Sequence, residues 1–273
     1  MNTVWPNLTI GIVGGGVMAE AILSRLLSGM SIRPEQIYVS DVAVKRLAVL
    51  ESRYQIQVSN DNAAVVQAAE ILLLAIKPQV FSTVGPELAQ VCATSTLVLS
   101  ILAGTPLSRL ESEFDQQPVI RAMPNTPATV GAGITAVAAG ARVQSTHLDI
   151  AQALFAAVGE VVVVPEMLMD AVTGLSGSGP AFVAMVIEAL ADGGVAAGLP
   201  RATSLQLALQ TVRGTAELLV QTHNHPALLK DQVASPGGTT IAGVAALEQA
   251  GLRSALIQAV MAAYRRSQAL GQG

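Results

Sequence analysis

The sequence predicts an α/β fold in residues 1–165, followed by an all-α fold in residues 166–273. Three observations support this division. Short apolar runs alternate with helical patterns as far as Pro165, the strand signals stop after that residue, and the remaining chain shows only helical periodicity. Because alternating strands and helices are typical of a sheet covered by helices, we expect two domains that meet near residue 165.

The first part contains short apolar runs that are typical of buried strands. These runs are residues 9–13, 37–39, 71–76, 97–101, 119–120, 135–137 and 161–164. Helical patterns lie between them, for example at residues 45–53 and after Pro78. Because strands that alternate with helices form βαβ units, we expect one parallel sheet.

The second part has apolar residues at steps of three and four, the spacing that places them on one face of a helix. The expected helices are residues 181–197, 202–222, 241–249 and 252–270. The face of the second helix is made by Leu205, Leu209, Val212, Ala216 and Leu219. These helices carry more apolar residues than one small domain can bury, so we expect an intertwined dimer through residues 166–273.

The turn after the first apolar run carries a glycine pattern. Gly14, Gly16 and Ala19 follow the strand at residues 9–13 and lead into a helical pattern. The first glycine permits a tight turn, the second lets a pyrophosphate approach the helix N-terminus, and the small third residue lets the helix pack on the sheet. This context favours a Rossmann-type dinucleotide-binding domain over an ordinary glycine-rich turn.

Two later turns, residues 174–180 and 235–240, combine glycine, proline and hydroxyl residues and contain no charged side chain. Each precedes an apolar helical pattern. The free N–H groups of a helix start favour an anion such as a small carboxylate. The alternative is ordinary capping, because serine, threonine, glycine and proline are common at helix starts.

Composition excludes several classes of function. A formal net charge of −4 and 3% aromatic residues argue against nucleic-acid binding. Only 12% of residues are charged while 51% are hydrophobic, which indicates a homo-oligomer with a buried interface. Cys92 is the only cysteine, so we expect no disulfide framework, no thiolate metal site and a reducing, cytoplasmic compartment.

The sequence also gives no reason to expect a membrane partner or a metal. The first residues lack the basic start and apolar core of a signal peptide. The uncharged stretch at residues 122–141 contains Pro124 and Pro127, which make it a poor membrane span. His223 and His225 are two residues apart, a spacing that does not place them on one helix face, so a loop or interface position is expected.

From Ile10 to Gly271 the chain resembles the pyrroline-5-carboxylate reductase family. The motifs that carry the resemblance are residues 14–18, 75–79, 100–104, 121–127, 175–181 and 235–240. The last two are the most specific, in this order and within a helical second part. The resemblance implies a Rossmann domain followed by an all-helical dimerisation domain, use of NAD(P)H, and reduction of the cyclic imine 1-pyrroline-5-carboxylate to L-proline.

By this resemblance Thr240 hydrogen-bonds the imine nitrogen. Because a threonine hydroxyl is a very weak acid, we expect it to orient the substrate or to relay a proton from water. The substrate, a small molecule with one carboxylate, is expected at Ser178, Gly179, Ser235, Gly237, Gly238 and Thr239. The cofactor is expected at Val13, Gly14, Gly15, Gly16, Val17, Met18, Ser40, Asn62, Ala75, Ile76, Lys77, Pro78, Ile101, Leu102, Ala103 and Asn125.

Several of these residues have a structural alternative. Lys77 could be a solvated lysine at a strand end, and Asn62 could be a helix cap, with Asp61 as its rival. Arg121 is as well explained by a buried ion pair beneath the site as by ligand binding. Asn125 lies between two prolines and could simply make a turn. Cys92 is expected at an exposed helix end, with a packing role only.

One departure from the family pattern concerns the coenzyme. The family often has an Asn-Arg or similar pair after the second strand, where this chain has Ser40 and Asp41. An aspartate there usually accepts the free ribose hydroxyls of NADH. Ser40, Lys45 and Arg46 could still form a pocket for the 2′-phosphate of NADPH. We predict NADPH as the cofactor, with NADH as the alternative.

Two rival functions are weighed against the reductase. A β-hydroxyacid-type dehydrogenase would want a catalytic lysine on a helix of the second part, whereas Lys230 is the only lysine after residue 165 and precedes a turn. A catalytically silent cofactor-binding regulator would have no need of the turn at residues 235–240. The expected assembly is a homodimer or a larger homo-oligomer, with a pentamer of dimers as one arrangement. In it the turn at residues 235–240 is expected to face the cofactor of a neighbouring subunit.

Overall fold

The computed structural model describes residues 8–29 and 32–271 and divides the chain into two compact units. The first unit comprises Met1–Gly177 and Ala263–Gly273, and the second comprises Ser178–Ala262. The boundary near residue 165 predicted from the sequence marks the end of the strands, since the last strand ends at Val163. As a boundary between domains it stays a prediction.

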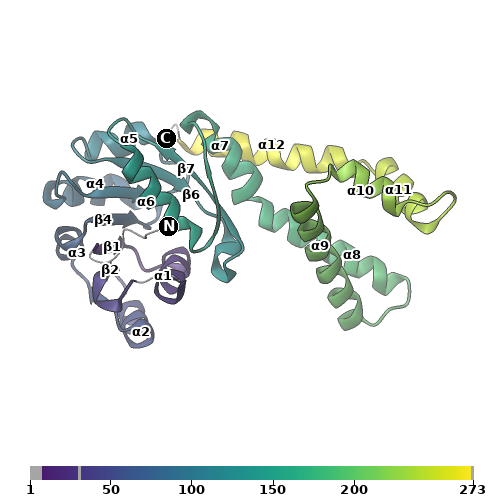
Figure 1. Cartoon of the computed structure of the whole chain (residues 1–273), viewed down its shortest axis with the longest axis horizontal. Coiled ribbons are helices and arrows are strands. Elements are labelled where there is room, and N and C mark those ends of the chain that lie inside the picture. The colour runs from purple at the N-terminus through teal and green to yellow at the C-terminus, as the bar shows by residue number, and fades with distance from the viewer. Residues whose placement is uncertain (1–7, 30–31, 272–273) are drawn as a thin grey trace. The chain divides into compact units, whose positions relative to one another are not determined.

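The first unit is built on an eight-stranded sheet with the order β3-β2-β1-β4-β5-β6-β7-β8 (Figure 1). The strands are β1 (Ile10–Val13), β2 (Ile37–Ser40), β3 (Gln57–Ser59), β4 (Ile71–Leu74), β5 (Leu97–Ser100), β6 (Val119–Met123), β7 (Gly133–Ala139) and β8 (Gly159–Val163). The strand order reverses between β1 and β4. The strands that follow β1 in the chain, β2 and β3, lie on one side of it, and the strands from β4 onward lie on the other side. In open α/β sheets ligands bind at the carboxyl ends of the strands at such a reversal.

The predicted parallel sheet is confirmed, with one pair of strands as an exception. Every pair of neighbours is parallel except β6 and β7, which are antiparallel with Ile120 opposite Ala139. The connection between them, residues 124–132, contains only the short 3₁₀ helix η2 (Thr126–Val130). A parallel return needs a crossover of roughly a dozen residues or more, so this short connection forces the reversed direction.

Helices cover both faces of the sheet. The helices on one face are α1 (Val17–Gly29), α2 (Val44–Tyr54) and α6 (Ser145–Ala156), and those on the other are α3 (Asn62–Ala68), α4 (Pro78–Val91) and α5 (Leu107–Glu113). Alternate strand residues face the two layers: in β4, Ile71 and Leu73 pack on the first, while Leu72 and Leu74 pack on the second. This double burial explains why the strands are continuous apolar runs rather than alternating ones.

All seven predicted strands are confirmed, and β3 was missed. β3 has three residues at the sheet edge and begins with an exposed glutamine, so it gives no apolar signal. The expected exposure of Cys92 is wrong. Its side chain is buried at the end of α4 among apolar residues, and this burial raises the pKa of the thiol. The packing role expected for it is confirmed.

The second unit is helical. Its helices are α8 (Gly179–Ala196), α9 (Arg201–Thr222), α10 (Pro226–Val233), α11 (Thr239–Gln249) and α12 (Leu252–Gly271), the last of which ends in the first unit. The four predicted helices are confirmed, and α10 was not predicted. Within Ser178–Ala262, all of which the structure describes, only Ala191, Ser204 and Ala208 are buried. They lie where α8 packs on α9, and the Ser204 hydroxyl donates to the Ala191 carbonyl at 2.6 Å.

One helical stretch among the described residues, Glu166–Ala196, is long and apolar enough to cross a membrane by length and composition alone. Little of it is buried within the chain. A single stretch of this kind is weak support for a membrane span. A helix that packs in the interface of an oligomer has the same composition.

Candidate nucleotide and substrate sites

Gly14 makes the turn at the reversal point of the sheet. Its φ of +101° lies in the left-handed region, and a Cβ at this position would lie 2.6 Å from the Ala75 carbonyl oxygen. Its N–H donates to the Ser40 carbonyl at 2.8 Å, so the turn after β1 contacts the ends of both β2 and β4. Only glycine fits here, as the sequence pattern predicted.

Gly16, two residues later, borders open space. A Cβ added to Gly16 would meet no described atom within 4 Å, and the residue itself is exposed. Helix α1 begins at the next residue, Val17, whose side chain is also exposed. The first N–H groups of α1 therefore adjoin an uncrowded space, where a pyrophosphate fits. Ala19 is buried against the sheet, as the pattern predicted, and Met18, a predicted cofactor residue, packs partly against the core.

The Gly15 peptide is held from both sides by residues of the second strand and helix. Its N–H donates to Asp41 Oδ2 at 2.8 Å, and its carbonyl accepts from Arg46 Nε at 2.5 Å. The other carboxylate oxygen of Asp41 accepts from the Ala43 N–H at 2.8 Å. Asp41 thus supports the glycine turn as well as standing at the end of β2, where a ribose hydroxyl would bind.

Arg46 is held in turn by Glu20 of α1. Arg46 Nη2 donates to Glu20 Oε2 at 2.5 Å, while Arg53 Nη1 and the Tyr54 hydroxyl donate to Glu20 Oε1 at 3.1 and 2.9 Å. The hydrogen bond from Arg46 is the main cause that lowers the pKa of Glu20, and burial is the main cause that raises the pKa of Tyr54. Neither Glu20 nor Tyr54 was predicted, because their partners lie far away in sequence.

The expected phosphate pocket of Ser40, Lys45 and Arg46 is not formed as such. The Ser40 side chain is completely buried, and its hydroxyl has no hydrogen-bond partner among the described residues. The buried hydroxyl does not face the surface of the described structure, and the place of Ser40 in the cofactor site stays a prediction. Lys45 is exposed and makes no ion pair within the described chain, whereas Arg46 is already occupied.

The remaining cofactor candidates lie at the carboxyl edge of the sheet. Ala75, Ile76, Lys77 and Pro78 follow β4, and Ile101, Leu102 and Ala103 follow β5. Lys77 is exposed at the N-cap position of α4. The Val13 and Leu102 side chains are buried in the core, so only their backbone could meet a cofactor.

Asp61, rather than Asn62, is the cap of α3. Asp61 Oδ1 accepts from the Ala63 N–H at 2.9 Å, and Asn62 is the first residue of the helix. The half-buried Asn62 side chain is therefore not used for capping. This arrangement leaves Asn62 available to a ligand, in line with the family resemblance.

Asn125 connects two parts of the first unit. Its amide Nδ2 donates to the Ser176 carbonyl at 3.2 Å, and its Oδ1 accepts from the Ile134 N–H at 2.9 Å. Ser176 lies in a π-helical turn, Thr173–Gly177, that precedes α8. Such turns widen a helix and leave carbonyl groups in need of partners. The Asn125 side chain thus orders the π-helical turn. Neither of its expected roles, a cofactor contact or a local turn between two prolines, included this contact.

Arg121 forms the buried ion pair that was one of its two expected roles. Its side chain is almost completely buried in β6, and its guanidinium lies 3.3 Å from Glu166 and 3.9 Å from Asp170. Asp170 also accepts a hydrogen bond from the Ser267 hydroxyl at 2.7 Å. The group joins the sheet, the segment that follows β8, and the end of α12.

The two predicted substrate turns differ in the structure. Residues 235–240 lead into α11, whereas residues 174–180 lie within the helical stretch Glu166–Ala196, where the π-helical turn Thr173–Gly177 runs into α8, so the prediction of a turn there is wrong. Ser178 is the N-cap of α8 and Gly238 is the N-cap of α11, and neither helix has a side-chain cap. Gly179 and the left-handed Gly237 border space that is open in the described structure. Helix α11 therefore presents uncapped N–H groups, the arrangement that the carboxylate interpretation requires, whereas α8 continues a preceding helical turn.

Thr239 and Thr240 are the first two residues of α11. Thr240 is half-buried and Thr239 is exposed, and neither hydroxyl has a hydrogen-bond partner among residues 8–29 and 32–271. Ser235 closes the turn, since its carbonyl accepts from the Gly238 N–H at 3.1 Å. The capping alternative for Thr240 is thus not observed, and its hydroxyl remains available to a ligand.

The two histidines near this region have structural positions. His225 is the N-cap of α10 and its Nδ1 accepts from the Ala227 N–H at 3.2 Å. His223 ends α9 in the left-handed conformation. Their loop position was expected from their spacing. Pro226 at the first turn of α10 was the available signal for this helix.

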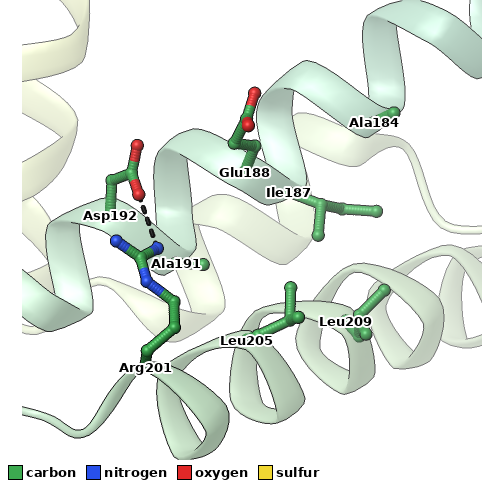
Figure 2. Close-up of a pocket in the computed structure, with 8 residues that line it drawn as sticks. All are labelled: Ala184, Ile187, Glu188, Ala191, Asp192, Arg201, Leu205 and Leu209. Carbon is green, nitrogen blue, oxygen red and sulfur yellow. Dashed lines mark hydrogen bonds and ion pairs between the residues drawn. The ribbon is translucent and has the colours of Figure 1, made fainter.

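An apolar groove of about 550 Å³ runs between α8 and α9 (Figure 2). Ile187, Leu205 and Leu209 line it, and the ion pair of Asp192 with Arg201 closes one end at 2.5 Å. Other large apolar side chains of these helices, among them Met185 and Leu190, are exposed on the single chain. An exposed apolar surface of this extent is typical of a protein interface.

Comparisons with known proteins agree with this arrangement. Residues 166–270 match the family model described as pyrroline-5-carboxylate reductase dimerisation, and residues 9–104 match one described as NADP oxidoreductase, coenzyme F420-dependent. A pyrroline-5-carboxylate reductase of Synechocystis is 59% identical over 97% of this chain and 99% of its own length.

Two solved structures are similar over nearly the whole chain. A Coxiella burnetii pyrroline-5-carboxylate reductase is 32% identical with a TM-score of 0.90, covering 96% of this chain and 98% of that one. A Plasmodium falciparum pyrroline carboxylate reductase, solved with NADP bound, is 29% identical with a TM-score of 0.89, covering 98% and 99% of the two chains.

Proposed function

Since the chain belongs to the pyrroline-5-carboxylate reductase family, we propose that it reduces 1-pyrroline-5-carboxylate to L-proline with NADPH. The observation that carries this proposal is the uncapped start of α11 with the free hydroxyl of Thr240, within a family motif of a chain that is similar to its relatives from end to end. Family membership also removes the β-hydroxyacid-type dehydrogenase as an alternative.

The first unit fits a dinucleotide by its own geometry. The glycine turn leaves room in front of α1, at the point where the strand order reverses. We expect the N–H groups at the start of α1 to bind the pyrophosphate, and Lys77, Asn62 and the segment from Ile101 to Ala103 to border the rest of the cofactor. When bound, the nicotinamide supplies the hydride that adds to the carbon of the C=N bond.

The residues of the second unit bind and orient the substrate. The uncapped N–H groups of Thr239 and Thr240 at the start of α11 would hold the single carboxylate without a charged side chain, with Ser178 and Gly179 as further candidates from the family resemblance. The free hydroxyl of Thr240 would hydrogen-bond the ring nitrogen, which gains a proton as the C=N double bond becomes a single bond. That proton comes from water through the hydroxyl, because threonine itself is too weak an acid to supply it.

The dimerisation family matched by residues 166–270 supports a homodimer. We propose further that dimers associate into a larger ring, as the family resemblance implies. We also propose a cytoplasmic location, since a single cysteine suits a reducing compartment. Mass measurement by light scattering tests the assembly, and a stable, active monomer would refute it.

Turnover with purified enzyme tests the activity. We expect NADPH oxidation that depends on 1-pyrroline-5-carboxylate and yields proline, and no oxidation of 2-hydroxy acids with NADP⁺. Cofactor binding without turnover of the imine would instead identify a silent regulator. Comparison of kcat/KM for NADPH and NADH tests the coenzyme, since a preference for NADH would refute that part of the proposal.

A further inference from the structure

Arg46 lies on α2 and contacts the glycine turn. In this fold an arginine near the end of the second strand can accommodate the 2′-phosphate of NADPH. The guanidinium of Arg46 is engaged elsewhere, with Nε on the Gly15 carbonyl and Nη2 on Glu20. Glu20 has a side chain that is 19% exposed and Arg46 one that is 28% exposed, so solvent screens this pair less than a surface pair.

The charges around this point oppose a phosphate. Asp41 ends β2 beside Gly15, and Glu20 adds a second carboxylate on α1. Arg53 also pairs with Glu20 rather than standing free. The cations of α2 are Lys45, Arg46 and Arg53, and of these only Lys45 makes no ion pair in the described structure. A phosphate arriving here must therefore compete with Glu20 for Arg46.

We propose that Glu20 is a specificity-determining residue for the coenzyme, because it holds Arg46 against the glycine turn and withholds this guanidinium from the 2′-phosphate. The contribution of Glu20 is thus to reduce the preference for NADPH over NADH. This inference rests on the proposed function only in requiring that the chain binds NAD(P)H. The low pKa of Glu20 keeps its carboxylate charged throughout the neutral range, so the effect is present under any ordinary assay condition.

The alternative is that the pair only joins α1 to α2. In that case loss of the Glu20 charge would lower the melting temperature and change the affinity for both coenzymes equally. The two explanations are separated by binding measurements on the intact enzyme, made without the imine substrate. Fluorescence of the bound dihydronicotinamide reports the dissociation constant of NADPH and of NADH directly.

Glu20→Gln keeps the shape and one hydrogen-bond acceptor but removes the charge. We expect the Kd of NADPH to fall roughly three- to tenfold, the range for release of one charge-assisted hydrogen bond, while the Kd of NADH changes less than about twofold. Glu51→Gln is the matched control, because Glu51 is an exposed carboxylate of α2 whose side chain makes no hydrogen bond or ion pair with these groups in the described structure. It should leave the ratio of the two constants unchanged.

A double-mutant cycle tests whether Arg46 transmits the effect. In an Arg46→Met background, Glu20→Gln should no longer improve NADPH binding beyond the change seen with Glu51→Gln. Weaker NADPH binding in Glu20→Gln, an equal change for both coenzymes, or an undiminished gain in the Arg46→Met background would each overturn the proposal. Failure of imine turnover would refute the proposed function and leave these binding constants interpretable.

Discussion

The two compact units bury their apolar residues to very different extents. In the first, entire strands and the facing sides of six helices are buried in two layers. In the second, three residues are buried, and large apolar side chains such as Met185 and Leu256 are exposed on the single chain. The comparison shows that the nucleotide-binding part has its own core, whereas the helical part leaves large apolar side chains exposed on the single chain, as expected of the dimerisation family that it matches.

The largest effect on folding is expected in the core of the first unit. Phe155 of α6 is completely buried against the sheet. Phe155→Ala should lower the free energy of unfolding by about 3–5 kcal/mol, through lost burial and the cavity that remains. Denaturant titration measures this loss. A cost below about 1 kcal/mol would show that this layer is not the closed core described here.

The second prediction tests the dependence of the helical unit on a partner. Met185→Glu places a charge on the exposed apolar face of α8. The dimer should weaken by about 3 kcal/mol, more than a hundredfold in its dissociation constant, because the charge must be desolvated in the interface. Analytical ultracentrifugation follows the dissociation.

The matched control for this change lies in the first unit. Val49 of α2 is also an exposed apolar residue, but it lies outside the dimerisation family match. Val49→Glu should leave the assembly intact. If Met185→Glu remained fully dimeric, or if Val49→Glu dissociated the dimer to the same degree, the contrast between the units would be wrong.

A smaller effect is expected at Asn125. Asn125→Ala leaves the Ser176 carbonyl and the Ile134 N–H without their side-chain partners. The free energy of unfolding should fall by about 1–2 kcal/mol, the usual cost of a lost hydrogen-bonding side chain. NADPH binding should change little if the amide only orders the π-helical turn. A Kd raised more than about tenfold, with unchanged stability, would make Asn125 a cofactor ligand.

Much of the fold was predictable from the sequence because its strands are buried on both sides. An uninterrupted apolar run such as Ile71–Leu74 can be recognised as a buried strand from the sequence, whereas the edge strand Gln57–Ser59 cannot. The direction of β7 could also have been inferred, since the segment between Met123 and Gly133 is too short for a crossover. Two features of the sheet were therefore missed. The edge strand β3 has a weak local signal, and the direction of β7 depends on the length of the segment before it.

The site was predictable where backbone conformation selects the residue. Gly14 must be glycine in its left-handed turn, and this requirement is visible in the sequence. The contacts of Arg46 with Glu20 and Gly15 were not predictable, because they depend on how α1 and α2 pack on the sheet. The burial of the Ser40 hydroxyl depends on the same packing. Side chains that act across elements therefore required the structure.

The smallest effect on folding and the clearest effect on turnover are expected at Thr240, whose hydroxyl makes no hydrogen bond in the described chain. Thr240→Ala should change the free energy of unfolding by only a few tenths of a kcal/mol, as for an ordinary surface substitution. Loss of one hydrogen bond to the ring nitrogen should lower kcat/KM for 1-pyrroline-5-carboxylate by about ten- to a hundredfold. NADPH affinity and assembly should be nearly unchanged.

The most direct test of the account is therefore kcat/KM of three variants measured side by side. Thr240→Ala should show the loss, Thr240→Ser should retain more activity because it keeps the hydroxyl, and Thr239→Ala should serve as the control at the adjacent, exposed hydroxyl. This order of activities is the result that the account predicts. Turnover near the wild-type value in Thr240→Ala would contradict the assignment of this turn to the substrate nitrogen.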